Sequence, residues 1–142
     1  MRITPENIYH IAENEIFVFG SNEAGRHGKG AAKLAMQWGA VYGQASGLQG
    51  HTYGIPTKDM HLGVLPVEKI RENVEEFFSF ASKSNFNFMV TKVGCGLAGY
   101  TPADMAPLFK QAETLNNIYL PVAFWEVING LLYSYPYGNK AF

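Results

Sequence analysis

The sequence has little of what marks a disulfide-stabilised, membrane-spanning or metal-dependent protein. A single cysteine, Cys95, cannot form an intramolecular disulfide, and the paired-cysteine patterns of structural zinc sites are missing. No apolar run reaches the roughly 18 residues of a membrane span, and residues 1–15 lack the basic and then apolar pattern of a secretory signal. The four histidines lack metal-ligand spacing. We therefore expect a soluble, cytoplasmic protein without a metal, cofactor or membrane association.

The chain also lacks an excess of charge of either sign. Its 11 Lys and Arg residues against 12 Asp and Glu residues give a net charge of -1, so a broad basic surface is excluded. Binding to duplex nucleic acid depends on such a surface, which argues against that partner but leaves a local phosphate site open. The length of 142 residues and a hydrophobic fraction of 47% predict one globular domain spanning residues 1–142. No feature predicts an oligomeric state.

What is present is an alternation of strand and helix patterns, which is typical of an α/β layered fold. Short apolar runs predict strands, and apolar positions at helical spacing predict helices. The glycine-rich residues 43–51 are expected to be a surface connection, and residues 56–59 are expected to leave the sheet. The expected strands are residues 16–19, 52–55, 86–93 and 117–120, and the expected helices are residues 31–38, 66–82, 101–112 and 122–132.

Residues 20–30 form a glycine-rich segment between an expected strand and an expected helix. Its glycines permit close backbone approach, and the helix start supplies unpaired N–H groups, so the segment suits a phosphate. A Walker loop is excluded because Arg26 and His27 stand where Lys and Ser or Thr are required. A dinucleotide fingerprint is disfavoured because Lys33 replaces the third glycine. Residues 94–99 form a second such loop, and the pair predicts a diphosphate site.

Three stretches of the chain together resemble a macrodomain. They are residues 26–32 (RHGKGAA), residues 55–58 (IPTK) and residues 93–97 (VGCGL). The pattern is most similar to the branch that removes terminal ADP-ribose from acidic side chains. The resemblance implies a three-layer α/β fold with a mixed β-sheet between helices. It also implies ADP-ribose, or an ADP-ribosylated substrate, as the partner, bound in a crevice between the two glycine loops.

The resemblance implies a catalytic role for Lys58, since a lysine at this position attacks the anomeric carbon of the sugar in that branch. An assisting aspartate follows the second loop's motif there, but this chain has Ala98, and Asp59 or Asp104 is the candidate replacement. Asp104 also fits a capping box with Thr101, which is the favoured explanation for it. The implied ligand-binding residues are Ser21, Asn22, Arg26, His27, Gly28, Gly30, Ala31, Gly94, Cys95, Gly96, Leu97, Ala98, Gly99 and Tyr100.

Two alternatives to hydrolysis stay open. The missing aspartate at Ala98 favours a reader that binds ADP-ribose without cleaving it. An interaction protein could instead use the aromatic C-terminal stretch with Tyr133, Tyr135 and Tyr137. Cys95 is interpreted as a structural residue, because no histidine is placed to activate it.

Overall fold

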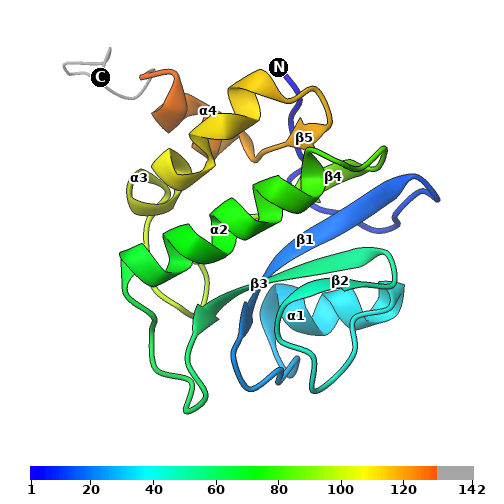
Figure 1. Cartoon of the computed structure of the whole chain (residues 1–142), viewed down its shortest axis with the longest axis vertical. Helices are drawn as coiled ribbons and strands as arrows, with labels where there is room; N and C mark the ends of the chain where they lie inside the picture. The colour runs from blue at the N-terminus through cyan, green and yellow to red at the C-terminus, as the bar shows by residue number, and fades with distance from the viewer. Residues whose placement is uncertain (131–142) are drawn as a thin grey trace.

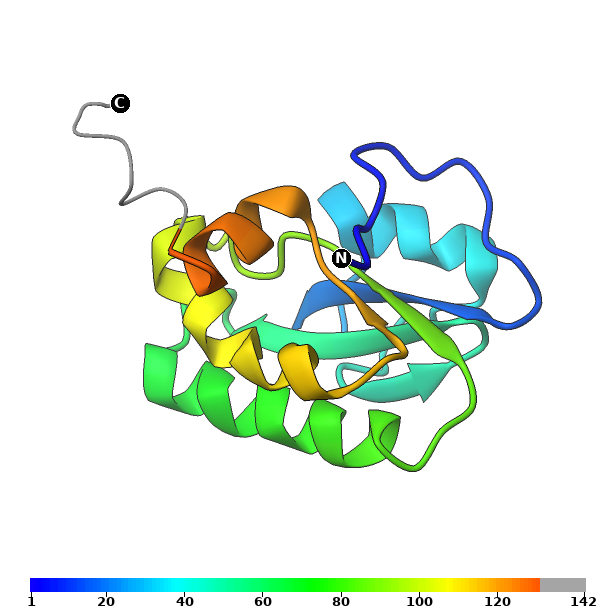
Figure 2. The same cartoon turned by 90° about the horizontal axis from the view of Figure 1, so that it is seen from above.

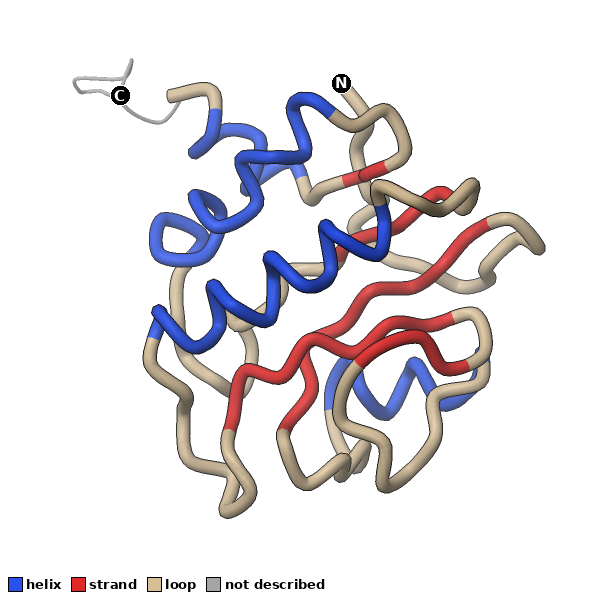
Figure 3. The backbone as a smooth tube through the Cα atoms, in the orientation of Figure 1, coloured by secondary structure: helices blue, strands red, loops and turns tan. Residues whose placement is uncertain are grey.

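The computed structural model describes residues 1–130, and its centre is a five-stranded sheet (Figures 1 and 3). The order across the sheet is β2-β3-β1-β4-β5. Strand β1 pairs in parallel with β3 and β4, and β4 pairs in parallel with β5, whereas β2 runs antiparallel to β3. The strands are β1 (Glu15–Asn22), β2 (Gly47–Gln49), β3 (Thr52–Lys58), β4 (Asn87–Val90) and β5 (Ile118–Tyr119).

Helices cover both faces of this mixed sheet, which gives three layers. The turned view in Figure 2 shows the sheet between α1 and α2. The apolar core on the α2 face also includes residues of α3, η2 and α4, while α1 covers a smaller core on the opposite face. The helical elements are α1 (Gly30–Ala35), η1 (Met36–Trp38), α2 (Val67–Ala81), α3 (Pro102–Met105), η2 (Ala106–Thr114) and α4 (Val122–Ile128).

Strand β1 explains how one sheet supports two cores. Its side chains alternate, so Ile16 and Val18 enter the α2-side core while Phe17 and Phe19 enter the α1-side core. All four side chains are buried, as expected for a central strand with parallel neighbours on both sides. The three-layer α/β fold with a mixed sheet is therefore confirmed.

Several segments differ from the sequence-based expectation. The supposed surface connection contains the edge strand β2. Strand β3 continues through Pro56 to Lys58, although residues 56–59 were expected to leave the sheet. The helix that begins at the predicted Thr101 N-cap changes to a 3-10 helix at Ala106. Helix α4 ends at Ile128; residues 131–132 of the predicted helix, and the tyrosines Tyr133, Tyr135 and Tyr137, lie outside the described residues.

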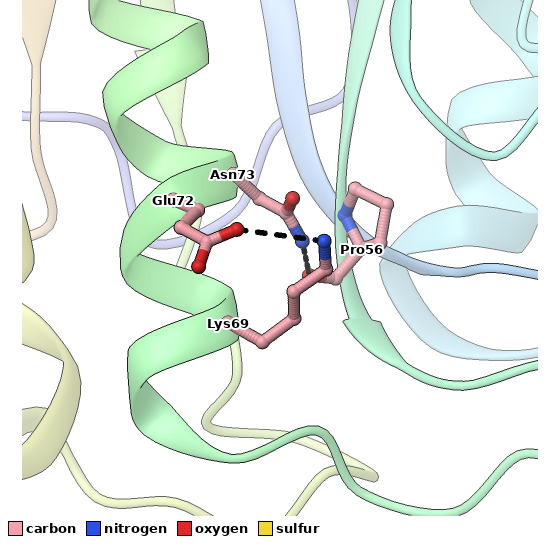
Figure 4. A network of polar contacts seen from close by, with 4 residues as sticks. All are labelled: Pro56, Lys69, Glu72 and Asn73. Carbon is pink, nitrogen blue, oxygen red and sulfur yellow. Dashed lines mark hydrogen bonds and ion pairs between the residues drawn. The ribbon is translucent and has the colours of Figure 1, made fainter.

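An open edge accounts for proline inside β3. Strand β2 pairs with β3 only as far as Gly54, so the outward side of Pro56 has no neighbouring strand. Its carbonyl instead accepts a hydrogen bond of 3.0 Å from the amide of Asn73 (Figure 4). Proline is tolerated on such an open edge because no ladder N–H is required there. The neighbouring Lys69–Glu72 ion pair is exposed, at 3.6 Å, and contributes little stability.

Arg2 fastens the N-terminal segment to the far edge of the sheet. Its guanidinium donates to the carbonyls of Ile118, Ala112 and Leu115 at 2.9, 2.8 and 2.5 Å. The Trp125 indole donates to the Arg2 carbonyl at 2.6 Å, and the guanidinium lies 5.9 Å from the centre of that ring. One side chain therefore joins η2, β5 and α4.

In residues 1–130 no helix has the length and apolar character needed to cross a bilayer.

We expect Arg2→Ala to lower the free energy of unfolding by about 2 kcal/mol, because it leaves three carbonyls without a charged donor. Urea unfolding at 25 °C measures this change. The control is Arg71→Ala, which removes only an exposed ion pair with Glu68 and should change stability by less than about 0.5 kcal/mol. Equal losses in the two variants would contradict the role given to Arg2.

Candidate functional site

Three loops meet at the edge where the parallel strands β1, β3 and β4 end. We call residues 22–30, 58–65 and 94–100 the loop cluster. At the end of β1, a Cβ added to Gly20 would lie 3.4 Å from the Gly94 nitrogen and 3.6 Å from the Thr57 side chain. The Tyr100 hydroxyl donates to the Leu65 carbonyl at 2.6 Å, which joins the second glycine loop to the loop after β3. Ligands of α/β sheets bind at such carboxyl edges.

The first glycine loop is shaped by Asn22. Its side-chain amide donates to the Arg26 carbonyl at 2.8 Å, and its side-chain oxygen accepts from the Arg26 N–H at 2.9 Å. Gly25 has a φ of 70°, and a Cβ there would lie 2.4 Å from the carbonyl carbon of Gly43. Only glycine fits this position. The Asn22 amide, one of the implied ligand-binding groups, is thus occupied in closing its own loop.

The second glycine loop turns at Gly94, which has a φ of 80°. A Cβ at this position would lie 2.6 Å from the Met105 sulfur, so α3 packs directly on the loop's first residue. The loop is closed by hydrogen bonds from Tyr100 N–H to the Gly94 carbonyl at 2.9 Å and from Gly99 N–H to the Gly96 carbonyl at 3.0 Å. The loop therefore has a fixed shape that is set by backbone contacts.

Backbone N–H groups are what these two loops offer to a ligand. Gly28, Gly30 and Gly96 are exposed, and a Cβ at any of them would meet nothing within 4 Å. Among residues 1–130, the N–H groups of Gly96, Leu97 and Ala98 donate to no backbone carbonyl. Lys29, the N-cap of α1, makes no side-chain capping bond. Such N–H groups suit an anion with several oxygens, such as a diphosphate.

Glu23, to which no sequence pattern points, lies beside Lys58. The half-buried Lys58 ends β3, its Cα is paired with that of Asn22, and its carbonyl accepts a hydrogen bond of 2.8 Å from the Glu23 N–H. Among the described residues Lys58 forms no ion pair. Only the pairing of β1 with β3 reveals the adjacency, because 35 positions separate the two residues in the chain.

His27 and Ser21 face the interior instead of the solvent. The His27 side chain is 1% exposed, and its Nε2 lies 3.0 Å from the Gln44 carbonyl. Ser21 is 2% exposed and donates to the Ala45 carbonyl. A phosphate contact from His27 would therefore have to come from its backbone.

Two solved structures match this arrangement of strands and helices. A Bacteroides thetaiotaomicron protein of unknown function matches with a TM-score of 0.59 and 15% identity, over 80% of this chain and 89% of that one. A macrodomain protein from Streptomyces coelicolor matches with a TM-score of 0.52 and 15% identity, over 83% of this chain and 90% of that one. The fold resembles a macrodomain. No protein-family model and no curated protein matches the sequence.

The likeness confirms the macrodomain-like fold and does not distinguish one branch of macrodomains from another.

Neither carboxylate expected to replace the aspartate missing at Ala98 is free. Asp59 accepts from the N–H groups of Gly63 and His61, which hold its pKa below the usual value. Asp104 forms the predicted capping box with Thr101, whose backbone and side-chain hydrogen bonds lower the pKa of Asp104. Both carboxylates are ionised at neutral pH and already hydrogen-bonded within their own turns.

A concave region of this macrodomain-like fold lies away from the loop cluster. A groove of about 700 Å³ runs between β2 and the C-terminal half of α2, and Leu48, Tyr53, Glu76 and Phe80 contribute to its lining. Burial, and then the charge of Glu76, raise the pKa of Tyr53 to about 12. We place the candidate site at the loop cluster because its exposed N–H groups suit an anion, whereas the groove is lined by one carboxylate, Glu76, and one cation, Lys83, whose charges cancel. Within residues 1–130 no group of three metal-ligating side chains forms.

Cys95 is a half-buried thiol. Burial raises its pKa to about 11, against a smaller opposing effect of Lys92. Its sulfur lies 3.7 Å from the Val93 carbonyl. The thiol is therefore protonated at neutral pH, which agrees with a structural role.

Because the raised pKa keeps the thiol protonated until the pH approaches 11, we expect Cys95 to react slowly with iodoacetamide at pH 8. The native protein should react on the order of a hundredfold slower than the urea-unfolded chain, whose thiol has a pKa of about 8.5. Mass spectrometry measures both rates on this single cysteine. A native rate that levels off near pH 9 would contradict the assignment.

Proposed function

We propose that the loop cluster binds ADP-ribose or a closely related nucleotide diphosphate sugar. The observation that carries the proposal is that a macrodomain-like fold places two glycine loops with exposed N–H groups on the adjacent strands β1 and β4. Backbone N–H groups on two sides suit the two phosphates of one ligand. Exposed cations at Arg26 and Lys29 add favourable charge. The N–H groups of residues 28–31 and 96–98 are the proposed phosphate ligands.

Isothermal titration calorimetry with ADP-ribose, ADP and AMP tests this proposal. We expect saturable one-to-one binding of ADP-ribose with a Kd below about 1 mM, and weaker binding of AMP, which has one phosphate. Gly28→Val and Gly96→Val should each reduce the affinity at least about tenfold, because the new side chain enters open space over the N–H groups without a clash inside the protein.

Ser79→Val is the matched control, since Ser79 is exposed on α2 and lines the groove beside β2. It should leave the Kd unchanged. If none of the three nucleotides binds at millimolar concentration, the proposed function is wrong. Loss of binding in Ser79→Val alone would indicate that the ligand binds in the groove.

A second candidate function, hydrolysis of an ADP-ribosyl bond, is favoured by the adjacency of Lys58 and Glu23. The Lys58 Nζ would attack the anomeric carbon and displace the substrate carboxylate, and water would then cleave the bond to lysine and release ADP-ribose. The Glu23 carboxylate would accept and return the protons, a function for which Asp59 and Asp104 are not free. The Glu23 N–H bond to the Lys58 carbonyl fixes the two residues next to each other. Without turnover, the protein is a reader of ADP-ribose.

An ADP-ribosylated glutamate peptide, followed by chromatography, decides between hydrolase and reader. For a hydrolase we expect Lys58→Ala to abolish release of ADP-ribose while the Kd for free ADP-ribose changes less than about threefold. Glu23→Gln should lower the rate about a hundredfold or more, and Asp59→Asn should lower it much less. Release that persists unchanged in both Lys58→Ala and Glu23→Gln would eliminate this mechanism.

A further inference from the structure

The first glycine loop is tied to a second segment, residues 41–45, which we call the strap. Each of its last three residues forms one bond to the end of β1 or to the loop. The Gly43 N–H donates to the Gly25 carbonyl at 2.8 Å, and the Ser21 hydroxyl donates to the Ala45 carbonyl. The third bond joins His27 to the Gln44 carbonyl at 3.0 Å. The strap therefore follows the first glycine loop along its length.

The imidazole of His27 makes the last hydrogen bond to the strap before the exposed residues 28–30. Beyond it, a Cβ at Gly28 or Gly30 would meet nothing within 4 Å, so space is open on the Cβ side of both residues. The ring is fixed by packing as well as by its hydrogen bond: Phe19 lies 5.3 Å away at 87°, and Tyr42 lies 6.2 Å away at 71°. The position of residues 28–30 depends on this ring on one side and on α1 on the other.

The hydrogen bond fixes the roles of the two ring nitrogens. A carbonyl only accepts, so Nε2 carries the proton and donates to Gln44. Among residues 1–130 the buried Nδ1 has no hydrogen-bond partner. A buried nitrogen without a partner is costly, and its presence indicates that the bond at Nε2 and the ring packing outweigh that cost.

The Gln44 carbonyl is itself held in place. It also accepts from the Gln49 side chain at 3.2 Å, and the oxygen of that side chain accepts from the Val41 N–H at 2.7 Å. Gln49 lies in β2 and is 3% exposed. The edge strand thus holds the strap, and the strap holds the first glycine loop through His27.

We propose that His27 is a positioning residue that sets the N–H groups of residues 28–30 in the orientation needed to bind a diphosphate. The proposal rests on the proposed function. His27 does not touch the ligand. Its hydrogen bond to the Gln44 carbonyl orders the loop before the ligand binds. Preorganisation of this kind raises affinity because less freedom is lost on binding.

Two His27 variants separate the hydrogen bond from the packing. In His27→Gln the side-chain amide nitrogen can take the place of Nε2 and donate to Gln44, whereas His27→Leu fills the space without a donor. We expect His27→Leu to weaken ADP-ribose binding about tenfold and to speed amide hydrogen exchange of residues 24–30. His27→Gln should stay within about threefold of the wild-type Kd, with slow exchange.

The control is Arg2→Ala, which removes hydrogen bonds at β5 and η2 and should leave both the Kd and the exchange of residues 24–30 unchanged. Ser21→Ala removes a different strap bond and should weaken binding about threefold, so it tests the proposal if His27→Leu does not fold. Equal effects of His27→Gln and His27→Leu, or wild-type binding and exchange in both His27→Leu and Ser21→Ala, would overturn the proposal.

The two proposals fail in different ways. If wild-type protein binds no ADP-ribose, the proposed function is wrong, and the exchange of residues 24–30 still shows whether His27 orders the loop. If the wild type binds and neither the His27 variants nor Ser21→Ala changes the Kd or the exchange, only the positioning role is wrong.

Discussion

The parallel pairing of β1 with its two neighbours is the constraint on which the candidate site depends. Residues 20–30, 58 and 94–100 are far apart in the chain, and only this pairing places them at one edge. Burial of Ile16, Phe17, Val18 and Phe19 on both faces of β1 stabilises that arrangement. One glycine loop follows β1 and the other follows β4, and Lys58 is the last residue of β3 between them and the edge strand β2.

The loops hold their shape through backbone geometry and a few buried polar side chains. Gly25 and Gly94 have positive φ values and lie where a Cβ would collide with Gly43 or Met105, so substitution would alter the loops. Gly28, Gly30 and Gly96 face open space, which leaves room for a ligand. Glycine thus serves two separate needs: close internal packing at the loop bases and access to N–H groups at the exposed positions.

Much of the fold was predictable because the signals are local. The apolar periodicity of α2, the apolar run of β1 and the capping box of Thr101 and Asp104 each lie within a few turns or residues. The edge strand β2 was missed because its three residues lie in a glycine-rich stretch with no alternating pattern. The extent of β3 was missed because proline normally ends a strand, and the open edge that tolerates Pro56 depends on where β2 stops pairing with β3.

The site was predictable only at the level of which loops it contains. The likeness to known structures shows the macrodomain-like fold, while the ligand, the branch and the single domain over residues 1–142 remain proposals. Sequence could not show that Ser21, Asn22 and His27 use their side chains internally, because two of these bonds go to backbone carbonyls of an unpatterned segment. It could not show the neighbour relation of Glu23 and Lys58 either, since strand register decides it.

The most direct test of the account is to locate the ligand by two-dimensional ¹⁵N–¹H NMR during titration with ADP-ribose. We expect the largest amide shifts in residues 28–31 and 96–98, with small shifts along β2 and the C-terminal half of α2. Shifts concentrated around Leu48, Ser79 and Phe80, with the two glycine loops unchanged, would contradict the assignment of the site to the loop cluster.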